Sequence, residues 1–371
     1  MITISLCMIV KNEEQLLSRC LDSVLGAVDE IILVDTGSTD RTREIAHSYT
    51  PHVYDFPWQN DFSAARNFAY SKASKDYQLW LDADDVLPPE DLHKLLSLKE
   101  TLPKGTDMVT MRYHTHFDET GAPVFTSTRE RLTKTEKAFR WQDPVHECIP
   151  LEGKLYHSDI AISHQKPPSA EVSIRNLEIY EALESQAHTF TPRQQYYFAR
   201  ELLDHGNFQK SAQYFAAFLN GGKGWLEDNI AACRALAHCH HALGQEENVL
   251  PLLLQSFQYD RPRGETCCEI GYHYSRTGQY DTALHWFQIA ANLLPPSGYG
   301  FVQPDYWSFI PQVESCVCAC HLGDFQAAWR YHKAAASHKP QHPTVAQNKA
   351  YLQSVLPHRD EESSGENAPP P

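Results

Sequence analysis

Apolar residues in the first 165 positions follow two alternating patterns. Short runs rich in Val, Ile, Leu and Tyr are separated by stretches in which apolar residues recur at helical spacing. This alternation predicts an α/β domain built on a mainly parallel sheet. The predicted strands are 3–10, 30–35, 53–56, 77–81 and 108–117, and the predicted helices are 14–26, 40–49, 61–74 and 89–99. Ligands bind beyond the carboxyl ends of the strands in such sheets, so the loops there are the place to look for chemistry.

The pattern changes at about Pro168, where strand signals stop and helices separated by glycine turns begin. Four turns, at 205–208, 243–245, 277–280 and 322–325, have a similar sequence, and their glycines lie 38, 34 and 45 residues apart. A degenerate period near 34 residues predicts stacked helical pairs and resembles tetratricopeptide repeats. Small residues follow three of the turns, where paired helices approach closely: Ala212, Ala283 and Ala327.

These patterns divide the 371 residues into three segments. We expect an α/β domain over 1–167, a helical linker with repeats over 168–356, and a disordered acidic tail over 357–371. The chain is longer than a usual single domain, and its 42% hydrophobic content is sufficient for two separate cores.

Charge and composition narrow the function classes. A formal net charge of −15 disfavours general nucleic-acid binding, because no basic surface is available to neutralise phosphates. The apolar run 2–10 lacks the basic start and cleavage site of a signal peptide, and no apolar run is long enough for a transmembrane helix. We therefore expect a soluble cytoplasmic protein, whose ten cysteines are reduced thiols.

The strongest chemical signal is the segment 79–85, where an apolar strand ends in the carboxylates Asp82, Asp84 and Asp85. Carboxylates this close repel one another unless a cation lies between them. Mg²⁺ and Mn²⁺ prefer oxygen ligands, and a diphosphate supplies the remaining ones. The segment therefore predicts a site for Mn²⁺ or Mg²⁺ with a nucleotide, and its alternative is a solvated acidic turn before the helix that follows Pro88.

Two further segments fit a nucleotide site. Asp35 stands at the end of the second predicted strand, before a glycine turn, where it can accept hydrogen bonds from a base or ribose. Arg66 lies near a helix start and carries a charge suited to a diphosphate. The alternatives are an ordinary strand-to-helix turn for Asp35 and a surface ion pair for Arg66.

Taken together, the segments MIVKNEE, VDTGSTDRT, DFSAARN and LDADD resemble family 2 glycosyltransferases, whose nucleotide-sugar domain has the fold called GT-A. The resemblance is strong over residues 2–100. It implies that Asp35 contacts the nucleotide, that Asp82 faces the ribose, and that Asp84 faces the metal and diphosphate with Asp85 nearby. It also matches Arg66 to the arginine of the ARN-type motif. The first loop lines the nucleoside pocket in the family, which here implies Val10, Lys11, Asn12 and Glu13.

Beyond residue 100 the resemblance is thinner, and 139–147 and 162–165 are similar to segments of the repeat-bearing branch of the family. Inverting members need a carboxylate base that deprotonates the acceptor. Glu147 and Asp143 are the candidates, with Glu147 preferred because we expect it to pair with the neighbouring His146. An ion pair and a turn are their alternative roles. His164 matches a late histidine that completes the metal site in some GT-A enzymes, and a structural histidine is the alternative.

The resemblance implies a metal-dependent, inverting glycosyltransferase with a nucleotide-sugar donor, for which UDP is the expected nucleotide. The architecture resembles bacterial transferases with repeat tails, which include the sublancin-type peptide S-glycosyltransferases. A peptide or protein acceptor held by the repeats is therefore expected ahead of a glycan. The alternative roles of the repeats are formation of a homodimer and scaffolding.

The same residues bear on three other functions. A sugar nucleotidyltransferase needs a glycine-rich loop after the first strand, and 6–14 contains no glycine. A dinucleotide-dependent oxidoreductase needs GxGxxG at that place, which is also missing. A repeat-based interaction scaffold with an inactive transferase domain is the main alternative, although the carboxylates and Arg66 are all present.

Overall fold

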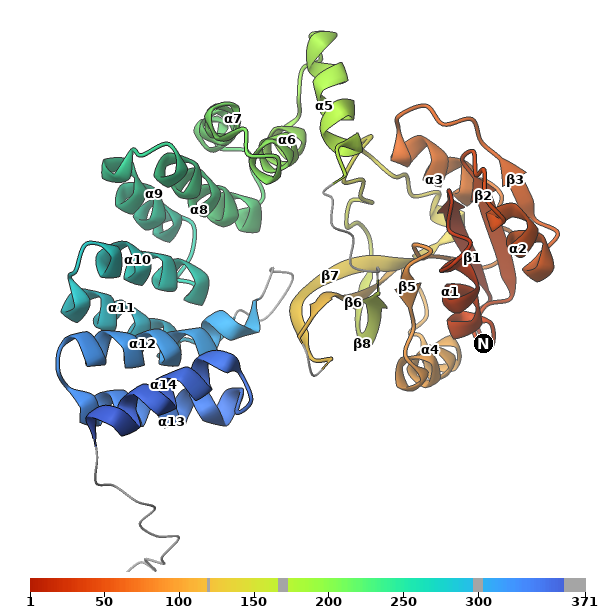
Figure 1. Ribbon diagram of the computed structural model, residues 1–371. Coiled ribbons are helices and arrows are strands. Elements are labelled where there is room, and N and C mark those ends of the chain that lie inside the picture. Colours follow the sequence, from red (N-terminus) through yellow and green to blue (C-terminus); the bar gives the residue numbers. More distant parts are fainter. Residues whose placement is uncertain (119–120, 166–172, 296–302, 357–371) are drawn as a thin grey trace, which may run out of the picture. The chain divides into compact units, whose positions relative to one another are not determined.

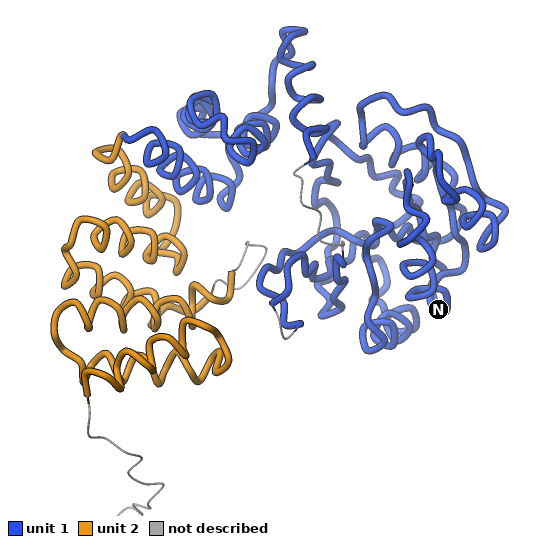
Figure 2. Tube along the Cα trace, viewed as in Figure 1, with its two compact units in different colours: residues 1–244, 296–302 blue, residues 245–295, 303–371 orange. Residues whose placement is uncertain are grey.

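The computed structural model describes residues 1–118, 121–165, 173–295 and 303–356. The chain forms two compact units (Figure 2). Unit 1 comprises Met1–Gly244 with Pro296–Val302, and unit 2 comprises Gln245–Pro295 with Gln303–Pro371. The predicted domain boundary at 167/168 and the predicted disordered tail 357–371 lie outside the described residues, and both stay predictions.

Unit 1 begins with an eight-stranded mixed sheet in the order β3-β2-β1-β4-β7-β6-β8-β5 (Figure 1). The strands are β1 (Ile4–Val10), β2 (Glu30–Asp35), β3 (Val53–Asp55), β4 (Tyr77–Trp80), β5 (Asp85–Val86), β6 (Met108–Phe117), β7 (Pro123–Lys134) and β8 (Leu155–His164). Parallel pairing joins β1 to β2 and β4, β2 to β3, and β6 to β8. The mainly parallel α/β sheet predicted from the sequence is therefore confirmed.

Helices cover both faces of this sheet because successive side chains of a strand point to opposite faces. The helices of this part are α1 (Leu17–Val24), α2 (Thr42–Tyr49), α3 (Phe62–Tyr70) and α4 (Pro89–Thr101). Leu6 and Met8 of β1 are fully buried in the core that α1, α2 and α4 share with the sheet. Cys7, between them, is buried in the second core, with Tyr70 of α3.

The parallel strands determine where chemistry can occur. β1, β2 and β4 run in the same direction, so their carboxyl ends meet at one edge of the sheet. This brings the loops that begin at Lys11, Thr36 and Leu81 together, although the sequence separates them by tens of residues.

The remainder of the chain is helical. Unit 1 continues with α5 (Arg175–Ser185), α6 (Pro192–Asp204), α7 (Phe208–Gly221) and α8 (Leu226–Ala242). Unit 2 contains α9 (Val249–Gln255), α10 (Gly264–Arg276), α11 (Tyr280–Asn292), α12 (Phe309–His321), α13 (Phe325–His338) and α14 (Pro343–Val355). Short 3-10 helices lie at Thr135–Lys137, Glu246–Asn248, Ser256–Gln258 and Pro304–Trp307.

The four predicted glycine turns share one backbone conformation. Gly206, Gly244, Gly278 and Gly323 have φ between +72° and +77°, in the left-handed region that favours glycine after a helix. Three of the turns lead directly into the second helix of a pair, and the small residues there are buried: Ala212 at 9%, Ala283 at 0% and Ala327 at 7% exposure. The predicted helical repeats are therefore confirmed.

Two further sequence-based expectations concern the described residues. Within the described ranges, no helix combines the length and apolar character that crossing a membrane requires. All ten cysteines are free thiols, and eight of them are buried. Burial raises the pKa of Cys7 and Cys20 in the α/β part, and the thiols of unit 2 are affected in the same way.

Candidate active site

A cavity of about 780 Å³ opens at the carboxyl edge of the sheet. Nine of the twelve predicted site residues line it: Val10, Lys11, Asn12, Glu13, Arg66, Asp82, Asp84, Glu147 and His164. Asp35, Asp85 and Asp143 do not belong to the lining. Each of these three carboxylates interacts with a polar partner outside the cavity lining. The sequence alone could not show these contacts.

The first loop is held by the loop that follows β2. Asn12 has a φ of +56°, and its side-chain oxygen accepts a hydrogen bond of 2.8 Å from the backbone N–H of Thr39. Its own N–H donates to Ser38 Oγ at 3.0 Å. Asp35 is 2% exposed and accepts hydrogen bonds from the N–H groups of Gly37 and Ser38, so its carboxylate shapes the turn. Thr36 lines the cavity in its place, and the contact of Asp35 with a nucleotide stays a prediction.

Three potential ligand atoms of Asp84, Asp85 and His164 lie within 4.8 Å of one another. The three residues are not equivalent. Asp85 is fully buried and paired with Arg131 Nη1 at 2.9 Å, and it also accepts a hydrogen bond of 2.9 Å from Tyr113. Burial alone raises the pKa of Asp85, but the charge of Arg131 and the hydrogen bond from His164 outweigh it and lower the pKa to about 2.

Asp84 and His164 face the cavity, with Oδ1 and Nδ1 3.2 Å apart. Burial lowers the pKa of His164, but the hydrogen bonds and charges of Asp84 and Asp85 raise it to about 10. The protonated imidazole thus supplies the positive charge that these carboxylates require. Carboxylate oxygens suit Mn²⁺ or Mg²⁺, and an ion bound there would take the place of that proton. The residues therefore fit a divalent cation.

Arg66 lines the cavity and pairs with two protein carboxylates. Its Nη2 lies 2.7 Å from Asp82 Oδ1 and its Nε lies 2.6 Å from Glu147 Oε1. The guanidinium carbon lies 5.0 Å from the ring centre of Trp80 and 4.8 Å from that of Trp141, so aromatic rings enclose the cation. Burial lowers the pKa of Arg66, yet the two carboxylates raise it overall. The alternative of a surface ion pair for Arg66 does not hold, since its side chain is buried, and the predicted contact of Arg66 with a diphosphate stays a prediction.

Glu147 lines the cavity, whereas Asp143 is turned toward α6. Asp143 Oδ1 accepts a hydrogen bond of 2.8 Å from Gln194 Nε2, and burial raises the pKa of this carboxyl group. The expected pair between Glu147 and His146 does not form. His146 Nε2 lies 2.6 Å from Glu201 Oε1 on α6 instead, because the backbone of His146, with a φ of +54°, directs its ring toward the helices.

Several lining residues were not found from the sequence. Tyr113 and Arg129 come from the long strands β6 and β7, and Arg175 and Asn176 come from the first turn of α5. No local pattern marks them, since each reaches the cavity only through the fold. The two arginines of β7, Arg129 and Arg131, were an available signal, because a buried strand seldom carries two arginines without carboxylates to pair with.

The α/β part of the chain, which contributes most of the cavity, is similar to a known protein family. Residues 5–156 match the family described as glycosyl transferase family 2. They form a family 2 glycosyltransferase domain. The sheet, the cavity and Arg66, Asp84 and Glu147 all lie within the matched residues of this transferase domain, while His164 and α5 lie beyond them.

Some relatives of this chain are named for their repeats and others as glycosyltransferases. A TPR repeat-containing protein of Synechococcus elongatus is 38% identical over 45% of this chain and 39% of its own length. The SPbeta prophage-derived glycosyltransferase SunS of Bacillus subtilis is 26% identical over 73% of this chain and 65% of its own. An uncharacterized glycosyltransferase of Rickettsia typhi is 39% identical over 24% of this chain and 30% of its own. The chain thus spans less than two thirds of these relatives.

Among solved structures, residues 1–349 of TarS from S. aureus overlay on 75% of this chain and 92% of their own at 16% identity. The TM-score of 0.36 is too low to carry an argument about function.

Proposed function

We propose that the protein is a divalent-metal-dependent glycosyltransferase that moves a sugar from a nucleotide-sugar donor, with UDP as nucleotide, to a peptide or protein side chain. The observation that carries this proposal is the placement of Asp84, His164 and Glu147 around one cavity beside the loop 10–13. A family 2 glycosyltransferase domain supplies the fold for this cavity.

Two groups of lining residues suit two parts of a nucleotide-sugar. The rigid loop that contains Lys11, Asn12 and Glu13 offers backbone and polar side-chain groups to a base and ribose. Asp84 and His164 would hold the cation, which offsets negative charge on the leaving diphosphate. Arg175 lines the same cavity and has no ion pair among the described residues, so it is a cation available to a phosphate oxygen, as is Lys11.

Glu147 is the proposed general base. Its Oε1 is fixed by Arg66, and its Oε2 accepts no hydrogen bond from the described residues. In the reaction, a bond forms between the acceptor atom and the anomeric carbon while the bond from that carbon to the diphosphate oxygen breaks. The electron pair leaves with the diphosphate, and the acceptor proton passes to Glu147. This single displacement inverts the anomeric centre.

The acceptor is proposed from the architecture. Helical repeats follow the transferase domain, and α5–α8 belong to the same compact unit as the sheet. A repeat surface beside a transferase cavity is suited to an extended peptide or a protein surface. We therefore propose a polypeptide acceptor in the cytoplasm.

Isothermal titration with UDP and GDP, each with Mn²⁺ and with EDTA, tests the nucleotide site. We expect UDP binding that requires Mn²⁺ and that Asp84→Ala abolishes. Asp159→Ala is a matched control, because Asp159 is an exposed carboxylate of the same sheet, with 72% of its side chain accessible. Absence of binding by either nucleotide would refute the transferase proposal and favour a repeat scaffold with an inactive domain.

A further inference from the structure

The segment 143–147, which carries the proposed base, is held by helices of the repeat region. Arg193 Nη2 donates a hydrogen bond of 2.9 Å to the carbonyl oxygen of His146. Gln194 Nε2 donates to Asp143 Oδ1 at 2.8 Å, and the hydroxyl of Tyr180 donates to the carbonyl of Val145 at 3.4 Å. These contacts join α5 and α6 to a segment that the transferase domain itself contributes.

The contact between His146 and Glu201 is the shortest of this set. Glu201 on α6 is 7% exposed, and its Oε1 lies 2.6 Å from His146 Nε2. The same oxygen accepts a hydrogen bond of 3.2 Å from Asn176 on α5. The ring of Tyr197 stacks on the imidazole, with centroids 4.3 Å apart and planes at 20°. His146 is thus enclosed on one face and anchored at Nε2 by a helix 55 residues further along the chain.

The backbone of the segment needs such anchors. Asp143 and His146 have φ values of +70° and +54°, in the left-handed region that side chains other than glycine seldom adopt. Each such residue costs roughly 1 kcal/mol or more and persists only where surrounding contacts determine it. Glu147 follows His146 directly, so the conformation of His146 sets the direction in which the Glu147 side chain leaves the backbone.

We infer that Glu201 is a positioning residue for catalysis: through His146 it holds the segment 143–147 in the conformation that directs Glu147 toward the acceptor. Helix α6 of the repeat region thereby positions the proposed base, in addition to any role in acceptor binding. This inference rests on the proposed function, since it assigns Glu147 as the base.

The charge state of Glu201 supports this arrangement. Burial raises the pKa of Glu201, but the hydrogen bond from His146 and the charge of that ring outweigh it, and the pKa falls below its ordinary value. Glu201 is therefore ionised at neutral pH and accepts from the imidazole at full strength.

The test compares three variants of the full chain: Glu201→Ala, Glu201→Gln and the control Asp204→Asn. Asp204 is exposed three residues further along α6 and makes no hydrogen bond to the segment 143–147. Three readouts are taken: UDP affinity with Mn²⁺, the steady-state release of UDP from UDP-glucose and UDP-N-acetylglucosamine, and amide hydrogen exchange of residues 143–148.

We expect Glu201→Ala to lower kcat for UDP release by about tenfold to a hundredfold, because a small displacement of a catalytic group has effects of this size. UDP affinity and the KM for the donor should stay within about twofold of wild type, since the donor ligands are untouched. Glu201→Gln keeps the acceptor oxygen for His146 and should recover most of the turnover. Exchange at 143–148 should accelerate in Glu201→Ala alone.

Wild-type turnover in Glu201→Ala, or unchanged exchange at 143–148, would overturn the inference. An equal loss in Asp204→Asn, or a fall in UDP affinity that parallels the fall in turnover, would also overturn it, because general destabilisation then explains the result. Failure of the proposed function has a different signature: wild-type protein would bind no nucleotide, while hydrogen exchange would still report whether Glu201 holds the segment.

Discussion

Replacing Arg66 by methionine is expected to destabilise unit 1 and, at the same time, to abolish activity at the site. The side chain of Arg66 is 7% accessible and pairs with Asp82 and Glu147 through two different nitrogen atoms. Removing the cation leaves two carboxylates facing each other, of which that of Glu147 is 12% accessible. Loss of one partner from a buried ion pair costs about 3–5 kcal/mol.

Two structural details favour the lower end of that range. The Nη1 atom of Arg66 is buried without a hydrogen-bond partner among the described residues, so the wild-type site already contains one unsatisfied donor. Methionine can also replace the apolar contacts of the arginine with Trp80 and Trp141. We therefore expect a loss of about 3 kcal/mol, which for a unit of this size lowers the melting temperature by roughly 6–12 °C.

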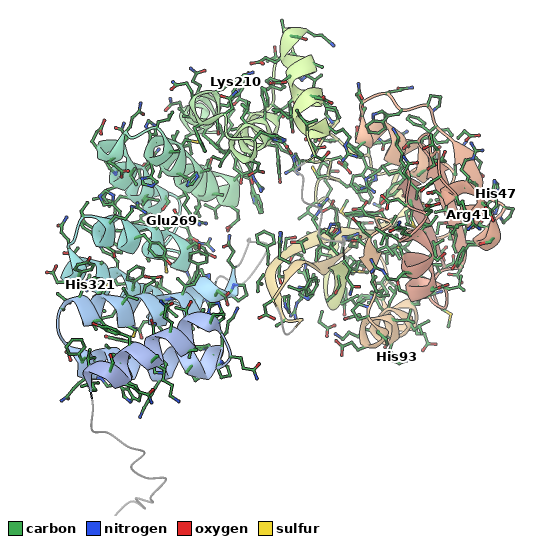
Figure 3. The ribbon with its side chains drawn as sticks, viewed as in Figure 1. Arg41, His47, His93, Lys210, Glu269 and His321 are labelled. Carbon is green, nitrogen blue, oxygen red and sulfur yellow. The ribbon has the colours of Figure 1, made fainter. Side chains whose placement is uncertain are left out.

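Differential scanning calorimetry measures the effect, read on the transition that UDP with Mn²⁺ shifts upward. Arg66→Lys keeps the charge but offers one ammonium group in place of two separated guanidinium nitrogens. Its melting temperature should therefore lie between those of the wild-type protein and Arg66→Met. Arg41→Met is the matched control. Arg41 lies at the protein surface (Figure 3), and its pair with Glu44 is 71% and 67% accessible, so solvent screens it.

The reasoning is refuted if Arg66→Met melts no lower than Arg41→Met. Normal UDP release by Arg66→Met would separately show that Glu147 and Asp82 do not depend on Arg66 for their positions.

Three further predictions follow from single residues. Burial raises the pKa of Asp228, which is 2% exposed, to about 6, despite the charges of Arg193 and Arg200. The wild-type protein therefore loses stability as the pH rises from about 4 to above 6. In urea titrations, Asp228→Asn should be more stable than wild type by up to about 3 kcal/mol at pH 8 and by little at pH 4. Equal stability of the two proteins at both pH values contradicts this. Arg175→Gln should weaken UDP binding about tenfold in calorimetric titrations without lowering the melting temperature, and unchanged affinity would exclude a phosphate contact. Gly271→Ala places a Cβ 2.7 Å from the ring of Phe287, so it should destabilise unit 2 by about 1–3 kcal/mol in thermal unfolding while UDP still binds normally.

Much of the fold is readable from the sequence because its signals are local. The strands β2 and β6 occur with the predicted bounds, and β1 and β4 end within one residue of them. By contrast, β7 and β8 were not predicted. Their sequences mix charged and apolar residues, and they become strands through pairing with β6 and β4, so tertiary hydrogen bonds outweigh weak local preference.

The sequence by itself determined which loops contain the site, since strand ends and clustered carboxylates are short-range features. Only the tertiary structure decided what each group does there. Asp84 and Asp85 are neighbours in the chain, yet one faces the cavity and the other is buried against Arg131. His146 pairs with Glu201, 55 residues away, and leaves Glu147 to Arg66. The strength of a charge interaction depends on distance and burial, and both are set by contacts between residues that are remote in sequence.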